Sequence, residues 1–395
     1  MDLKNKNIMF ACCYEAQYGG NFIKMLDALA SSLKQKYQAE IGFVFPKQSD
    51  KEWLTELAGK YKVGFTCKPY SKSSNDILNL IEKWNIDLVH THFEGYDVPV
   101  AKAINKSGKN VKMVWHLHDY LSLDKTGMKF KLIRKVGTNL KLWQHYGWYG
   151  RNAYFVGVSA EATNVATHYL HHIFSFPKVM TNGQLSSKIY PNASVLLNGI
   201  DLQRFSSDYK LPSGVFTFLT FGGESYSKGI PCLLDAAEIL ASMKIDFRII
   251  VTKGYTTQNL VDDRYGNVIP KWLKIVNQTD DIASVFNQAH CYISASLKET
   301  MSMAIAEASI YGLPVIQSDI YGTWWNACTP SAFLFKLNDA NDLAEKMMQV
   351  MEMPTDTMRA LCTKSQIINK ARLSVGRWTD KMIEIFEELC CSAKS

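Results

Sequence analysis

The sequence lacks the features of membrane-spanning, secreted and disordered chains. No stretch of its 395 residues approaches the roughly 18 consecutive apolar residues of a spanning helix. The first ten residues lack the basic-then-apolar layout of a signal peptide. Apolar residues make up 47% and charged residues 21%, close to the globular average, which argues against wholesale disorder and collagen-like repeats. We therefore expect a globular chain in the cytoplasm.

Cysteine is present without the spacing that would make it structural. The nine cysteines are an odd number and contain no Cys-x-x-Cys pair, which argues against both a disulfide framework and a zinc site. Neither an Asp-x-Asp motif nor a histidine cluster suggests a bound metal. We expect free thiols in a reducing compartment and no metal site.

Positive charge is concentrated in the first half of the chain. Residues 1–205 carry 26 Lys and Arg against 16 Asp and Glu, a net charge of +10, and the remainder carries −3. The densest stretch runs from Lys125 to Arg151, with five aromatic residues interleaved. That composition suits an anionic membrane surface, and it also suits single-stranded nucleic acid. The alternative is a solvated face over buried aromatic residues.

Short apolar, β-rich runs alternate with stretches of helical period along the whole chain, which predicts parallel sheets. The series restarts after loop-forming residues near Ser206–Gly214, so we expect two doubly wound α/β domains. The expected division is 1–205, 206–376, and a last helix over 377–395 that packs back on the first domain. The strands are expected at residues 8–13, 41–45, 88–92, 112–118, 154–159 and 195–197, then 215–221, 247–252, 274–276, 291–294, 314–318 and 332–335.

The segment with the strongest chemical signal follows the expected strand 291–294. A polar loop leads into a helix expected to start near Thr300, whose unpaired N–H groups would bind a phosphate or diphosphate. Glu299 lies at the helix entrance and Glu307 about two turns later, roughly 12 Å along one side of the helix. Carboxylates can accept hydrogen bonds from the vicinal hydroxyls of a hexose or a ribose. The alternative is a favourable first-turn charge and a solvated helix residue.

This segment resembles the signature of retaining glycosyltransferases of family 4, in which Glu, seven residues and Glu precede a later Gly-x-Pro-Val. Further similarities occur in the family's order across nearly the whole chain. They are Gly19-Gly20, Asp87-Leu-Val-His-Thr-His92, His116-Leu-His118-Asp119, Asn198-Gly-Ile-Asp201 with Phe205, and Phe221-Gly-Gly-Glu-Ser-Tyr-Ser-Lys228-Gly229. The resemblance implies the GT-B fold, in which two Rossmann-like domains face each other across a cleft.

The resemblance also implies roles for residues of the second domain. Glu299 matches the residue that holds the donor sugar hydroxyls, and Glu307 matches the residue that holds the ribose. Lys228 matches the cation on the diphosphate. The backbone of Thr300, Met301 and Ser302 matches the turn that meets the sugar and the diphosphate.

Three residues of the first domain also match. His118 resembles the histidine that touches the donor sugar, with His116 as the alternative on the same face of the strand. Gly19 and Gly20 resemble a loop in which backbone approaches a phosphate closely. A core histidine and an ordinary turn are the structural alternatives.

Two positions depart from the family pattern. Many members carry an Arg five residues before the Lys, and here that position is Gly223, followed by Glu224. Arg248, Lys253 or Lys298 would have to replace the missing cation. Position 300 is Thr where many relatives have Gly, which would narrow the donor pocket.

The implied activity is a retaining, metal-independent transfer of a hexose from a nucleotide sugar, with a uridine diphosphate sugar as the expected donor and no cofactor. The expected acceptor is a lipid-linked or growing cell-surface glycan at the inner face of the cell membrane. Lys129, Lys131, Arg134 and Lys135 would lie on the membrane and acceptor side, and no nucleic acid is expected as a partner.

Two other functions stay open, and a third lacks its motif. One is transfer to a soluble acceptor, and another is a non-catalytic binding protein on a decayed transferase fold. A dinucleotide-dependent oxidoreductase needs Gly-x-Gly-x-x-Gly after the first strand, which Tyr14–Gly20 does not supply.

Overall fold

The computed structural model describes residues 3–46, 51–67, 70–119, 131–171, 192–205, 211–266 and 268–391. The chain divides into two compact units. The first contains residues 1–199 and 376–395, and the second contains residues 200–375. The second unit thus begins six residues before the expected boundary, because Ile200 pairs with the end of the second unit. Its N–H donates to Leu373, and its carbonyl oxygen accepts from Val375.

In the described part of the first unit, parallel strands form one sheet in the order β3-β2-β1-β4-β5-β6-β7. The strands are β1 (Asn7–Cys12), β2 (Glu40–Pro46), β3 (Lys62–Thr66), β4 (Leu88–His92), β5 (Lys112–Leu117), β6 (Ala153–Gly157) and β7 (Ala193–Val195). The helices are α1 (Gly20–Tyr37), α2 (Glu52–Ala58), α3 (Ser74–Lys83), α4 (Asp97–Ser107), α5 (Lys131–Leu142), α6 (Ala160–His171) and α14 (Val375–Cys391).

In the described part of the second unit, the sheet order is β10-β9-β8-β11-β12-β13, again all parallel. The strands are β8 (Thr217–Phe221), β9 (Arg248–Thr252), β10 (Leu273–Val276), β11 (Cys291–Ser294), β12 (Val315–Ser318) and β13 (Ala332–Phe335). The helices are α7 (Ile230–Ser242), α8 (Thr257–Tyr265), α9 (Ile282–Phe286), α10 (Met303–Tyr311), α11 (Trp324–Ala327), α12 (Ala340–Glu352) and α13 (Thr355–Leu373).

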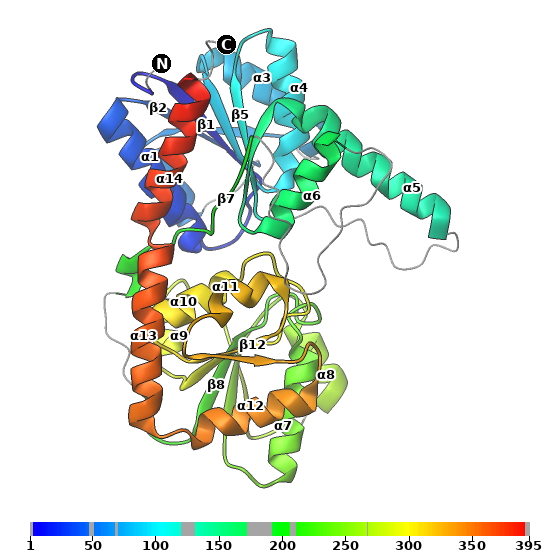
Figure 1. The fold of residues 1–395 in the computed structure, drawn as a ribbon, viewed down its shortest axis with the longest axis vertical. Coiled ribbons are helices and arrows are strands. Elements are labelled where there is room, and N and C mark those ends of the chain that lie inside the picture. The colour runs from blue at the N-terminus through cyan, green and yellow to red at the C-terminus, as the bar shows by residue number, and fades with distance from the viewer. Residues whose placement is uncertain are drawn as a thin grey trace. The chain divides into compact units, whose positions relative to one another are not determined.

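In each sheet the chain first adds strands toward one edge and then returns to add strands toward the other. This switch lies next to β1 in the first unit and next to β8 in the second, as in doubly wound folds. The fold class predicted from the alternating pattern is therefore confirmed for both units (Figure 1). In such sheets, ligands bind at the carboxyl ends of the strands near this reversal. In the first unit this edge lies where β1, β4 and β5 end, and in the second where β8 and β11 end.

The last helix, α14, completes the first unit. Its apolar face buries Trp378, Met382 and Phe386, and each such side chain contributes about 1.5–3 kcal/mol to stability. At its outer side, Tyr37 donates a hydrogen bond of 3.0 Å to Glu387. The expected return of the C-terminal helix to the first domain is confirmed.

Candidate active site

The carboxyl edge of the second sheet brings Lys228 and Glu299 together. The loop after β8 carries Lys228, and the loop after β11 carries Glu299. The Lys228 Nζ lies 2.6 Å from the Glu299 Oε1, which also accepts a hydrogen bond of 2.9 Å from Ser296. The Glu299 side chain is 12% exposed and that of Lys228 38%. An ammonium with free donors beside a partly buried carboxylate suits a ligand that joins a diphosphate to a sugar.

Gly322 packs directly against the backbone of Glu299. This buried glycine precedes α11, and a methyl group added to it would overlap the Glu299 carbonyl oxygen and lie 2.9 Å from the Glu299 Cβ. No larger residue fits without moving the Glu299 backbone. Sequence reasoning missed this position, because the contact joins two loops 23 residues apart.

The helix that carries Glu307 begins later than the sequence suggested. Helix α10 starts at Met303 with Ser302 as its N-cap, so Thr300, Met301 and Ser302 form a turn that precedes it. Glu299 and Glu307 are therefore not on one continuous helix, and the expected 12 Å helical span between them is wrong. The Ser302 side chain makes no capping hydrogen bond and the first turn contains no acid, so the helix N-terminus keeps its positive character.

A buried polar network behind α10 fixes its position. The Asn369 side-chain amide of α13 donates hydrogen bonds of 2.7 Å to the Ser309 hydroxyl of α10 and of 2.9 Å to the Asn326 Oδ1. The Asn326 amide in turn donates 2.9 Å to Gln317 of β12. Because these groups are buried, losing one partner would leave another unsatisfied, so the network resists displacement of the helix.

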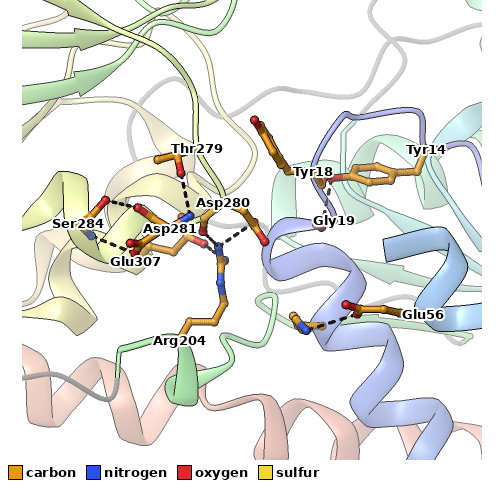
Figure 2. Close-up of polar contacts among 11 residues, drawn as sticks. Tyr14, Tyr18, Gly19, Glu56, Arg204, Thr279, Asp280, Asp281, Ser284 and Glu307 are labelled. Carbon is orange, nitrogen blue, oxygen red and sulfur yellow. Dashed lines mark hydrogen bonds and ion pairs between the residues drawn. The ribbon is translucent and has the colours of Figure 1, made fainter. Parts of the chain in front are cut away.

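Glu307 is paired with Arg204, a residue that sequence reasoning did not single out. The Arg204 Nη1 lies 2.9 Å from the Glu307 Oε1, and both side chains are largely buried, 12% and 10% exposed (Figure 2). The Arg204 Nη2 donates 3.2 Å to the Asp280 carbonyl oxygen. Burial raises the pKa of Glu307 to about 7, although the adjacent guanidinium opposes the rise. A buried carboxylate requires a partner, and that rule was the available signal.

Backbone geometry explains why position 223 carries Gly and not Arg. Gly223 has φ +46, a conformation that side chains other than Gly rarely adopt, and its oxygen accepts a hydrogen bond from Tyr255. Glu224 instead caps the following turn, since its Oε2 accepts a 2.7 Å hydrogen bond from the Ser227 N–H. This turn presents Lys228, whose N–H donates to the Glu224 carbonyl oxygen.

Of the three possible replacements, Arg248 lies at the wrong end of the sheet. It begins β9 opposite Thr217, four residues and roughly 13 Å from the carboxyl edge. Lys253 follows β9 directly at that edge and is exposed, and Lys298 is exposed in the loop that carries Glu299. The two lysines therefore remain as candidates.

In the first unit, the Gly19-Gly20 pair begins α1 after the loop that follows β1. Gly19 packs against Trp53, whereas Gly20 has φ +54 and open space on its Cβ side. The Lys51 ammonium stabilises this loop by donating hydrogen bonds to the carbonyl oxygens of Glu15 and Ala16. Tyr14 donates 2.9 Å to the Tyr18 carbonyl oxygen and 3.3 Å to that of Gly19 (Figure 2). The open side of Gly20 permits close approach to its backbone.

The fold assembles four histidines that the sequence separates into two pairs. His90 and His92 end β4, and His116 and His118 lie at the end of β5, the next strand of the sheet. The His90 Nε2 lies 3.2 Å from the His116 Nδ1, and the His92 Nδ1 lies 2.9 Å from the His118 Nε2. Aromatic rings enclose the group, with Phe386 of α14 against His90 and Trp378 against His116.

Only His118 of this cluster is partly exposed; His116 is 2% exposed, and His90 and His92 are fully buried. The structure therefore favours His118 over His116 as the histidine able to meet a ligand. Burial lowers the pKa of all four, that of His118 to about 3. His118 is thus a neutral imidazole, suited to hydrogen bonding rather than to carrying a positive charge.

Three histidines of the cluster are the group that could hold a metal among the described residues. One ring nitrogen of each of His90, His92 and His116 lies within 4.8 Å of the others, and each ring also has a buried nitrogen without a hydrogen-bond partner. The expectation from the sequence was that no histidine cluster of this kind would form. Without a metal, the His90–His116 hydrogen bond leaves one ring lone pair and one N–H of this pair without a partner among the described residues.

The predicted membrane side is described in part. Lys129 lies outside the described residues, as do the side chains of Lys131, Arg134 and Lys135 on α5. Further along the segment, exposed apolar side chains occur at Val136, Leu140 and Trp148. The Arg151 guanidinium lies 5.1 Å from the Trp148 ring centre, a cation–π contact. Tyr146 is buried, so the aromatic residues divide between core and surface.

Together, the two sheets and this edge geometry define the GT-B fold class. Residues 215–353 match the family described as Glycosyl transferases group 1. Over 98% of the chain, the structure is similar to a glycosyltransferase from Rickettsia africae, with a TM-score of 0.71, 18% identity and 100% of that chain covered. HepE of Anabaena in complex with UDP-glucose gives a TM-score of 0.72 at 17% identity over 97% of this chain and 99% of the other.

One relative has a name that states its donor, acceptor and linkage. The chain is 24% identical over 214 residues to the UDP-Gal:alpha-D-GlcNAc-diphosphoundecaprenol alpha-1,3-galactosyltransferase of Escherichia coli. The match covers 50% of this chain and 54% of the relative, so the chain spans about half the length of the curated relative that it matches.

Proposed function

We propose that the chain is a retaining, metal-independent glycosyltransferase that moves a hexose from a nucleotide diphosphate sugar to a lipid-linked or growing cell-surface glycan. The observation that carries this proposal is the meeting of Lys228 and Glu299 at the carboxyl edge of the second sheet, beside the N-terminus of α10. The match of residues 215–353 to glycosyl transferases group 1 supports it.

The donor is proposed to be a uridine diphosphate sugar. The names of the Escherichia coli relative and of the Anabaena complex both contain such a donor. In this proposal Glu299 binds the sugar hydroxyls and Glu307 the ribose. Lys228 and the backbone of Thr300, Met301 and Ser302 bind the diphosphate.

For the first unit, we propose that His118 contacts the donor sugar and that the backbone of Gly19 and Gly20 contacts a phosphate.

In the proposed reaction, the acceptor oxygen bonds to the anomeric carbon as the bond from that carbon to the phosphate oxygen breaks. The departing oxygen takes the acceptor proton, and the sugar keeps its anomeric configuration. Charge develops on the diphosphate, where Lys228 and the α10 N-terminus stabilise it, and such preorganised charges supply much of an enzyme's rate acceleration.

Binding and transfer can be tested separately. Nucleotide diphosphates should raise the melting temperature of the wild type, because a ligand that binds only the folded state stabilises it. Glu307→Ala should reduce the shift, and the matched change Glu345→Ala, on α12 of the same unit, should leave it unchanged. Product analysis should then find retention at the anomeric carbon. No shift with any nucleotide refutes the donor assignment, and an inverted anomer refutes the mechanism.

We also propose that the enzyme is peripheral on the inner face of the cell membrane. The basic residues Lys129, Lys131, Arg134 and Lys135, followed by exposed Val136, Leu140 and Trp148, support this. Among the helices that the structure describes, none combines the length and apolar character needed to cross a bilayer.

Vesicle sedimentation tests the membrane proposal. Replacement of Lys131, Arg134 and Lys135 by Glu should abolish binding to vesicles that contain anionic lipid. The control carries the same charge change at three exposed lysines of the second unit, Lys271, Lys274 and Lys364, and should bind like the wild type. Equal binding of both variants contradicts the proposal.

A further inference from the structure

Arg204 occupies a position in the second unit that no motif assigned. It lies in a short helical turn, Leu202–Phe205, that follows the point where the chain enters the unit. The turn is fixed at both ends. The Asp201 Oδ1 accepts 3.0 Å from the Gln203 N–H, and the Phe205 ring packs on Phe286 and Tyr311, with centroids 6.3 and 5.6 Å away. The arginine therefore extends from an anchored backbone rather than a free loop.

The guanidinium meets Glu307 through one oxygen only. Its Nη1 donates a hydrogen bond of 2.9 Å to the Glu307 Oε1. Its Nη2 donates one of 3.2 Å to the Asp280 carbonyl oxygen and lies 3.4 Å from the Asp280 Oδ1 (Figure 2). Within the described residues, the Glu307 Oε2 has no hydrogen-bond donor. One carboxylate oxygen is thus held by the protein and the other is available to a hydroxyl group.

The charge state of Glu307 depends on this contact. A carboxylate that is about nine-tenths buried would take up a proton if its cation were removed, because an isolated buried charge costs far more than a buried neutral acid. A neutral carboxyl group is a weaker acceptor, since hydrogen bonds to charged groups are about twice as strong as neutral ones. Arg204 therefore controls how well Glu307 can accept a hydroxyl hydrogen bond.

We propose that Arg204 is a positioning residue for ribose recognition: it holds Glu307 ionised and orients its free oxygen toward the ribose of the nucleotide donor. This inference rests on the proposed function, because it takes Glu307 as the ribose-binding group. It adds that specificity for a ribonucleotide over a 2′-deoxyribonucleotide depends on a residue that itself makes no contact with the ribose.

The test compares the dissociation constants of each nucleoside diphosphate and its 2′-deoxy form by calorimetry at pH 7.5, with uridine, guanosine and adenosine diphosphates as probes. Titration of the phosphate is shared by the two forms and cancels in the ratio. The wild type should prefer the ribonucleotide by about tenfold or more, as expected for a hydrogen bond to a charged group. Arg204→Gln should reduce this ratio to about twofold or less, as Glu307→Gln should.

Two further variants separate positioning from folding. Arg204→Lys keeps a cation and should restore part of the preference. Arg264→Gln removes another arginine of the same unit that is paired with carboxylates, Asp235 and Glu238, and should leave the ratio unchanged. Arg204→Gln combined with Glu307→Gln should lose no more preference than either change alone.

The outcomes separate the two proposals. A wild-type ratio retained in Arg204→Gln, or an equal loss of affinity for both forms that leaves the ratio intact, overturns the role of Arg204 while the donor site stands. If Arg204→Gln fails to fold, Arg204→Lys and the Glu307 variant still decide the ratio. A wild type that binds none of the nucleotides refutes the proposed function, and this inference with it.

Discussion

The histidine cluster of the first unit predicts that this unit loses stability in mild acid. The unfolded chain binds a proton at each histidine near pH 6.5, whereas in the folded unit the pKa of His90, His92, His116 and His118 lies well below that value because the rings are desolvated. Below pH 6.5 the unfolded state therefore binds more protons, and the free energy of unfolding falls with falling pH.

The size of the effect follows from linkage. Between pH 7.5 and 5.5, each histidine that stays neutral in the folded state costs about 1.4 kcal/mol, so four cost about 5.5 kcal/mol. This is a large part of the roughly 5–15 kcal/mol that stabilises a folded domain. The stabilisation is complete above about pH 7.5 and is lost progressively as the pH falls below 6.5.

Native-state hydrogen exchange can measure this separately for each unit. The opening free energy of amides in β4 and β5 should fall by about 5 kcal/mol between pH 7.5 and 5.5, after correction for intrinsic exchange rates. His116→Gln should reduce the fall in opening free energy by the contribution of one histidine, about 1.4 kcal/mol. His168→Gln on α6, outside the cluster, should leave this fall unchanged. A flat profile for β4 and β5, or the same slope in His116→Gln, would refute the assignment of buried neutral histidines.

Three other changes test the second unit. Gly322→Ala should lower transfer at least tenfold and destabilise the unit by about 1–3 kcal/mol, because its methyl group displaces the Glu299 backbone; unchanged kinetics contradict the contact. Lys253→Ala should weaken binding of a nucleotide diphosphate about tenfold while Arg248→Ala does not, and equal effects by calorimetry contradict the edge argument. Binding of a UDP-sugar, whose phosphates do not titrate near neutrality, should strengthen as the pH rises through about 7, and Glu307→Gln should abolish that dependence.

The alternation of strands and helices was predictable because buried parallel strands and amphipathic helices carry distinct apolar periods. The strand β3 (Lys62–Thr66) was not predicted from the sequence, because it lies at the sheet edge, mixes polar with apolar residues and leaves Phe65 exposed. The start of α10 was misplaced because Thr300 and Ser302 are both residue types common at helix N-caps, and the local sequence does not distinguish between them.

The candidate site was predictable where it follows a strand end. Lys228 and Glu299 each lie after a strand of one sheet edge, and the resemblance supplied their register. The Arg204–Glu307 pair joins residues 103 apart, so no local pattern could reveal it. The histidine cluster had a visible signal, because two His-x-His segments on neighbouring strands of one parallel sheet place four rings on one face.

Burial lowers the pKa of the histidine cluster in the first unit and raises that of Glu307 in the second, so acid acts on the two sites with opposite sign. In the first unit it weakens the fold by protonating buried bases. In the second, the pKa of Glu307 is about 7, above its unfolded value, so the folded state binds the extra proton and this contribution to stability is lost as the pH rises through 7. The protonated form that stabilises the fold is the weaker acceptor for ribose hydroxyls. Burying Glu307 therefore favours donor binding at the expense of stability at neutral pH, a trade that functional sites commonly make, and the ion pair with Arg204 reduces this cost.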